Sequence, residues 1–170
     1  MRCENSLTRA FALAGVFLIA AGMAACSKKP QQPQNMAIGQ GLGGSAAPGS
    51  ARDFAVNAGD KVYFTVDSSS LTSEAKTTLR QQATWLNKYP QYGVRLEGHA
   101  DERGTREYNI ALGARRAAAV RSYLAGLGVN AGRLRTISYG KERPVAVCND
   151  ISCWSQNRRA VTVLNSRAGS

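Results

Sequence analysis

The sequence has only one histidine, His99, among its 170 residues, and this scarcity limits the chemistry available to the chain. A zinc site that uses two histidine ligands is therefore excluded. The sequence also lacks Gly-x-Ser-x-Gly, the pattern that presents the serine nucleophile of many hydrolases. These absences favour a protein that binds over one that catalyses, and we expect neither an enzyme nor a cofactor.

Runs of basic residues are also absent, although basic residues are plentiful. Lys and Arg number 22 against 11 Asp and Glu, which gives a formal net charge of +11. No five consecutive residues are basic, whereas many nucleic-acid binders cluster their charge. We expect no nucleic-acid partner. The charge has two interpretations, a solvated basic surface or attraction to an anionic membrane face or an acidic polymer.

No hydrophobic run is long enough to predict a membrane span with confidence. The apolar stretch of residues 10–21 is shorter than the about 20 residues that a spanning helix needs. Arg2 and Arg9 lie before it. A short charged region followed by a short apolar region is typical of a secretory signal.

The segment Met23-Ala24-Ala25-Cys26 resembles a bacterial lipobox, whose cysteine is acylated and becomes the first residue of the mature protein. Met23 stands where Leu is usual. Ser27, in place of Asp, resembles lipoproteins that are exported to the outer membrane. We predict a signal peptide over residues 1–25 and lipidation of Cys26. The alternative is ordinary cleavage near Ala25, which leaves Cys26 free.

Cysteine is scarce, and its placement favours one disulfide. Of the four cysteines, Cys3 would leave with the signal and Cys26 would be acylated, so Cys148 and Cys153 remain as a pair. An oxidising compartment favours a bridge between them, which would stabilise the fold by about 2 kcal/mol. A redox-active pair is the alternative, although Cys-x-x-Cys is the usual spacing for that function.

The segment of residues 28–50 is rich in Gln, Gly, Pro, Ser and Ala and has no periodic apolar pattern. Such composition predicts a flexible tether, or a spacer with no particular length requirement. We assign residues 26–52 to the lipidated cysteine and tether, 53–166 to one folded domain, and 167–170 to a tail. A domain of roughly 110 residues can bury one core, and no second large core fits.

The hydrophobic pattern of the domain predicts four strands and two helices. The expected strands are residues 61–66, 94–99, 134–139 and 160–164. One helix follows the potential cap Thr72 and ends at Pro90, and the other runs from about 106 to 127 after Thr105. The order strand–helix–strand–helix–strand–strand predicts an α+β fold, an α/β sandwich. Its four-stranded mixed sheet would carry the helices on one face.

Residues 97–105 lie at the predicted strand-to-helix junction, a place where ligands commonly bind. Alternation along the strand brings Asp101 to its end, just before the long helix. On that helix Asn109, Leu112 and Arg116 share one face. Asp101 could accept an ammonium group, and the planar guanidinium of Arg116 could hold a carboxylate. The pattern alone fits equally ordinary roles, with Asp101 as a turn acid and Arg116 as a surface arginine.

A metal-dependent hydrolase is the remote alternative. Glu97, His99 and Asp101 alternate on the same strand and could bind a metal, with Glu102 as the base. A lone histidine is more often a partner that shapes the end of a strand.

Several long motifs, in order along the chain, resemble the OmpA C-terminal-like family, in particular its peptidoglycan-associated lipoproteins. The longest is Glu97-Gly98-His99-Ala100-Asp101-Glu102-Arg103-Gly104-Thr105. The others are Glu107-Tyr108-Asn109, Leu112-Gly113, Arg115-Arg116-Ala117, residues 138–144 and residues 157–161. The resemblance covers about residues 60–165. Its departure from the best-known members is the loop from Cys148 to Cys153.

The resemblance implies a site for diaminopimelate, which belongs to the peptide stem of peptidoglycan. The family's two binding residues fall on Asp101 and Arg116, and its helical asparagine falls on Asn109. The weaker candidates are Val66, Asp67 and Arg158.

The resemblance also implies non-covalent anchoring of the outer membrane to peptidoglycan. The lipid on Cys26 would hold the protein in the outer membrane, with its domain facing the periplasm. The expected partners are peptidoglycan, TolB and the Tol complex, in the system that supports membrane integrity and constriction during division. A module that mainly binds a TolB-type protein is the alternative.

Overall fold

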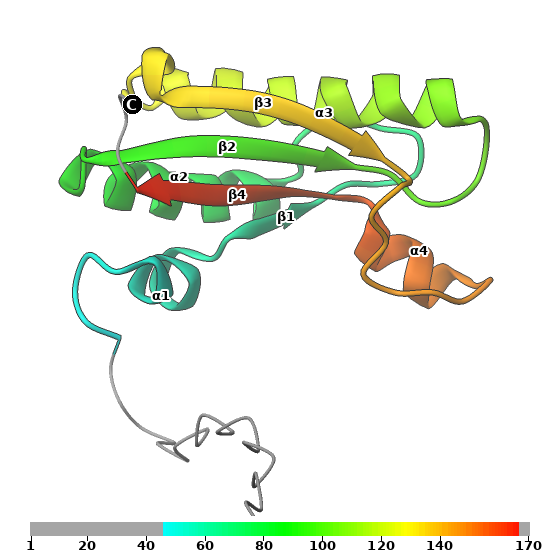
Figure 1. Ribbon diagram of the computed structural model, residues 1–170, viewed down its shortest axis with the longest axis horizontal. Coiled ribbons are helices and arrows are strands. Elements are labelled where there is room, and N and C mark those ends of the chain that lie inside the picture. The colour runs from blue at the N-terminus through cyan, green and yellow to red at the C-terminus, as the bar shows by residue number, and fades with distance from the viewer. Residues whose placement is uncertain (1–45, 167–170) are drawn as a thin grey trace, which may run out of the picture. The chain divides into compact units, whose positions relative to one another are not determined.

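The computed structural model describes residues 46–166, and Figure 1 shows the arrangement of their helices and strands. The predicted signal peptide, Cys26, most of the predicted tether and the tail lie outside the described residues. The elements are α1 (Ala51–Asp53), η1 (Phe54–Ala58), β1 (Lys61–Tyr63), α2 (Ser73–Lys88), β2 (Tyr92–His99), α3 (Arg106–Gly126), η2 (Ala131–Arg133), β3 (Leu134–Gly140), α4 (Ile151–Asn157) and β4 (Arg159–Ser166).

The four strands form one mixed sheet in the order β1-β4-β2-β3. β4 runs antiparallel to both β1 and β2, whereas β2 and β3 are parallel and are joined through α3. Both long helices, α2 and α3, lie on the same side of the sheet and enclose the core against it (Figure 1). The predicted α+β fold is therefore confirmed.

The helices begin and end where local chemistry predicts. The side chain of Thr105 accepts a hydrogen bond from the backbone N–H of Tyr108 and caps α3. The side chain of Thr72 caps α2 in the same way. After α3 the chain turns at Gly128, whose φ of 89° is a left-handed conformation that favours glycine.

The fold differs from the sequence prediction at β1 and at α4, among other places. β1 ends at Tyr63, three residues before the predicted end of that strand, because it pairs with only three residues of β4. Helix α4 was not predicted, since it is short and buries only Cys153 and Asn157. Cys148 and Cys153 form a disulfide, with their Cα atoms 5.7 Å apart, at the start of this helix.

Asp53 anchors the start of the described chain to the core. Its carboxylate accepts hydrogen bonds from Trp85 Nε1 at 2.7 Å, the Gly49 N–H at 2.9 Å and Asn57 Nδ2 at 2.6 Å. These bonds, chiefly that from Trp85, hold the pKa of Asp53 below its ordinary value. Helix α1 thus begins two residues before the predicted start of the domain.

Within residues 46–166, every helix is too short or too polar to cross a membrane.

Candidate binding site at the end of β2

The loop between β2 and α3 is held by side chains along its backbone. Lys141 Nζ donates hydrogen bonds to the carbonyl oxygens of Glu102, at 3.2 Å, and Gly104, at 2.7 Å. Asn109 Nδ2 donates to the carbonyl oxygen of Arg103 at 2.7 Å. Three successive carbonyl groups therefore have side-chain partners, which preorganises the loop.

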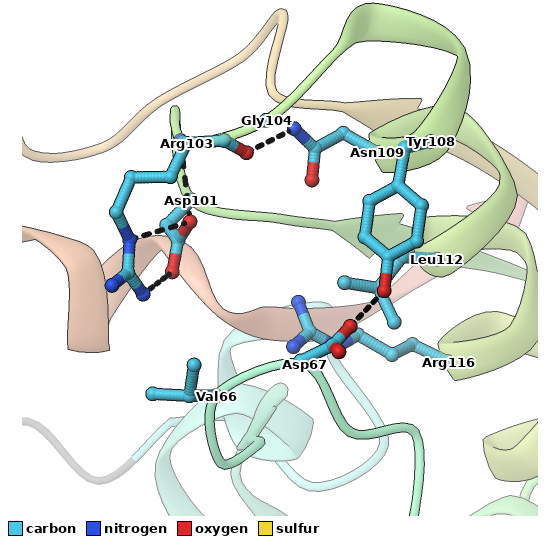
Figure 2. Close-up of a pocket in the computed structure, with 9 residues that line it drawn as sticks. All are labelled: Val66, Asp67, Asp101, Arg103, Gly104, Tyr108, Asn109, Leu112 and Arg116. Atoms are coloured by element: carbon cyan, nitrogen blue, oxygen red, sulfur yellow. Dashed lines mark hydrogen bonds and ion pairs between the residues drawn. The ribbon is translucent and has the colours of Figure 1, made fainter.

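A cavity of about 240 Å³ lies between this loop, α3 and the segment after β1 (Figure 2). Its lining combines both signs of charge with an apolar wall. The lining residues are Val66, Asp67, Asp101, Arg103, Gly104, Tyr108, Asn109, Leu112 and Arg116. The structure thus brings together five of the six predicted binding residues, Val66, Asp67, Asp101, Asn109 and Arg116.

Asp101 presents a buried carboxylate that is held by two arginines. Its Oδ2 atom lies 2.7 Å from Arg103 Nη2 and 3.2 Å from Arg158 Nη1. Burial alone would raise the pKa of Asp101, but the hydrogen bonds from these arginines lower it below its ordinary value. Asp101 is therefore charged near neutral pH and can accept from a further cationic donor.

Arg116 brings a buried positive charge from α3 to the cavity wall. Its Nη1 donates to the His99 carbonyl oxygen at 2.7 Å, and its Nε donates to that of Ser68 at 2.8 Å. Among residues 46–166, no carboxylate lies within ion-pair distance of its guanidinium. Burial lowers the pKa of Arg116 to about 10, so it stays charged at neutral pH. Such a cation favours an anion in the cavity.

Asp67 and Tyr108 meet beside Arg116, as Figure 2 shows. The Tyr108 hydroxyl donates a hydrogen bond to the Asp67 carboxylate, and this bond raises the pKa of Tyr108. Asp67 has a φ of 52°, a left-handed conformation that is uncommon for a residue other than glycine. This contact joins the segment after β1 to α3 at the cavity.

Arg158, the sixth predicted residue, does not line the cavity. Its Nη1 atom lies 3.2 Å from the Asp101 carboxylate, and its Nε atom donates to the Phe64 carbonyl oxygen at 3.2 Å. Arg103 and Tyr108 line the cavity, although no binding role was predicted for them from the sequence. Both lie inside the motifs that carry the family resemblance, and Arg103 follows Asp101 by two residues. This closeness to Asp101 in the sequence was the signal that could have indicated a role for Arg103.

The residues of the alternative metal site do not converge. Asp101 is bound by arginines at the cavity, whereas Glu97 and His99 do not line it. Within residues 46–166, no three His, Cys, Asp or Glu side chains gather in a way that could hold a metal ion. His99 Nε2 lies 3.9 Å from Glu97 Oε2, and the rings of His99 and Tyr139 lie 5.5 Å apart between centroids.

His99 is 2% exposed, and neither of its ring nitrogens has a hydrogen-bond partner among residues 46–166. Burial lowers its pKa from 6.5 to about 4, and the nearby charges of Arg159 and Arg143 contribute. The unfolded chain therefore takes up a proton on this residue before the folded chain does. We expect stability to fall as the pH drops from 6.5 to 4, by at most about 3 kcal/mol.

Urea unfolding at several pH values checks this expectation in the native chain and in a His99→Gln variant. The variant should show a flatter dependence between pH 6.5 and 4, whatever its absolute stability. Asp53 and Asp101, whose pKa values are lowered, lose their contribution only below about pH 4. Parallel profiles for the two proteins would rule out His99 as the source.

Comparison with known proteins places this chain in a defined class. Residues 63–159 match the sequence profile of the OmpA family, and the chain belongs to this family. Within it, the chain belongs to the peptidoglycan-associated lipoproteins.

The protein of that name from Rhizobium meliloti is 64% identical over 149 residues, covering 87% of this chain and 84% of the relative. The one from Brucella melitensis is 57% identical over 166 residues, covering 97% and 98%. Among solved structures, the peptidoglycan-associated lipoprotein of Burkholderia pseudomallei is 45% identical with a TM-score of 0.61. That match covers 62% of this chain and 90% of the other.

Proposed function

We propose that this protein anchors an outer membrane to peptidoglycan without a covalent bond, by gripping diaminopimelate in the peptide stem. Its relatives are named for their association with peptidoglycan, and its cavity suits a ligand that carries both charges. The observation that carries the proposal is that one cavity is lined by Asp101 and by a buried Arg116, whose guanidinium has no carboxylate within ion-pair distance among the described residues.

The free end of a diaminopimelate side chain carries an ammonium and a carboxylate group on one carbon. Asp101 would accept hydrogen bonds from the ammonium, and Arg116 would donate to the carboxylate. Each charged contact contributes roughly 1.5–3 kcal/mol when shielded from water. Two such contacts with backbone support correspond to micromolar rather than nanomolar affinity. Asn109 fixes the loop, while Asp67 borders the end of the cavity near Arg116.

Attachment to the membrane would come from acyl chains on Cys26 after removal of residues 1–25. More than one acyl chain is needed for durable attachment. Residues 27–48 would supply reach between the membrane and the wall, since Gly49 is already bonded to Asp53 of the domain. Many copies with modest individual affinity would together make a strong joint.

By family resemblance, the protein would act with TolB and the Tol complex in membrane integrity and in constriction of the envelope during division. The competing proposal is a module whose main partner is a TolB-type protein. Pull-down with purified sacculi separates the two. An interaction module would leave the protein in the supernatant, whereas the anchoring function requires its recovery with the sacculi.

Calorimetric titration tests the zwitterion grip directly. A stem peptide that contains diaminopimelate should bind at least roughly tenfold more tightly than the same peptide with lysine at that position. The lysine side chain ends in an ammonium group alone and leaves Arg116 without a carboxylate partner. Pimelate, which lacks both ammonium groups, serves as the matched probe for the carboxylate contact alone. Equal affinity for the two peptides would contradict the grip.

A further inference from the structure

Helix α4 is held at both ends, although it has no residue in the cavity. The Cys148–Cys153 disulfide and the Asp150 side chain, which accepts from the Ser152 N–H at 2.7 Å, hold its start. At its end, Asn157 Oδ1 accepts from the Val145 N–H at 2.9 Å. A short helix fixed in this way can act as a rigid support for a neighbouring loop.

The neighbour is the loop that carries Asp101, and the contact is made by Trp154. Its indole N–H donates a hydrogen bond to the Glu102 carboxylate. Its ring lies 4.3 Å from the guanidinium carbon of Arg103, close enough for a cation–π interaction. One side chain of α4 therefore holds two successive residues of the loop.

Arg103 in turn orients the carboxylate of Asp101. Its Nη2 lies 2.7 Å from Oδ2, and its Nε lies 3.3 Å from Oδ1. The side chain of Arg103 is 42% exposed, so it is not fixed by burial. Its placement depends on the carboxylate at one end and on the ring of Trp154 at its face. Without the ring, the orientation of the carboxylate would depend mainly on Arg158.

We propose that Trp154 is a positioning residue for ligand binding, which holds Glu102 and Arg103 so that the Asp101 carboxylate meets the ligand's ammonium group in one orientation. This inference rests on the proposed function. It also gives the disulfide loop a role, because that loop fixes the helix from which Trp154 extends.

Calorimetry with diaminopimelate tests the proposal in the domain with its native disulfide. Trp154→Ala should weaken binding roughly five- to tenfold, since both loop contacts are lost. Trp154→Phe keeps a ring beneath Arg103 and should restore part of the affinity. The control is Ile151→Ala on the same helix, whose side chain is exposed and which should bind as the native chain does.

A double-mutant cycle distinguishes positioning from general support. If Trp154 acts through Asp101, then Trp154→Ala should change affinity less than about twofold in an Asp101→Asn background. Binding of pimelate should be equally insensitive, because pimelate has no ammonium group. Replacing both Cys148 and Cys153 by Ser should lower the affinity for diaminopimelate in the same direction as Trp154→Ala, by a smaller factor.

Two results would overturn the inference. One is unchanged or tighter diaminopimelate binding by a folded Trp154→Ala variant. The other is that Trp154→Ala weakens diaminopimelate binding equally in the native and Asp101→Asn backgrounds, or weakens pimelate binding by the same factor. If the native chain itself does not bind diaminopimelate, the proposed function is wrong. That result differs from equal effects of Trp154→Ala in the two backgrounds, which would contradict only the role of Trp154.

Discussion

Replacing Asp101 by Asn should weaken binding of diaminopimelate roughly 10- to 100-fold, the largest loss of affinity that we expect from one nearly isosteric change. Asn keeps the shape of the side chain but removes the charge that attracts the ammonium group. It also leaves Arg158, whose side chain is only 8% exposed, without its ionic partner. The affinity should therefore fall with some loss of stability.

The measurement is titration with diaminopimelate, together with a urea curve that shows the variant is folded at the temperature used. Asp60→Asn is the matched control, because Asp60 is a partly exposed acid that pairs with Lys61 away from the cavity. It should bind as the native chain does. A folded Asp101→Asn variant with native affinity would show that the ligand's ammonium group binds elsewhere.

Replacing Gly98 by Ala should destabilise the domain by at least about 3 kcal/mol, the largest loss of stability that we expect. A Cβ atom on Gly98 would lie 1.8 Å from the carbonyl oxygen of Gly113, at a close approach of β2 and α3. The clash is with backbone, so no side chain can rotate to relieve it. The midpoint temperature of thermal unfolding should fall by roughly 10 °C or more.

Gly126→Ala, at the end of α3, provides the control. Its Cβ atom would meet no atom within 4 Å, and alanine is the better helix former. We expect stability to rise by up to about 1 kcal/mol. If the Gly98→Ala variant had the same unfolding temperature as the native chain, the close approach of β2 and α3 would not be a constraint on the fold.

The long helix was predictable from sequence because its signals are local. Thr105, Gly128 and the buried positions between them follow from capping chemistry and from a period of 3.6 residues. The same period places Asn109, Leu112 and Arg116 on one face, and the structure lines the cavity with all three. Helix α4 carries no such pattern, since its stability comes from a disulfide and from side-chain bonds to other segments.

The contacts that the cavity residues make with other side chains could be predicted from the sequence only in part. The Asp101–Arg103 pair lies within one loop and is a local feature of the motif. The contact of Asp67 with Tyr108 joins residues that are 41 positions apart, and that of Trp154 with Glu102 spans 52. No periodicity within one element predicts such contacts, because they depend on how separate elements pack.

By itself, the sequence determined the four strands and two long helices of the α+β fold and the residues that could hold opposite charges at one junction. It also determined the family, through motifs that keep their order along the chain. The tertiary structure decided the strand order β1-β4-β2-β3 and the burial of Arg116 beside Asp67 and Asp101. It also decided the support of the binding loop by α4. The physical reason is that capping and periodicity act over a few residues, whereas burial and ion pairing depend on segments brought together by the whole fold.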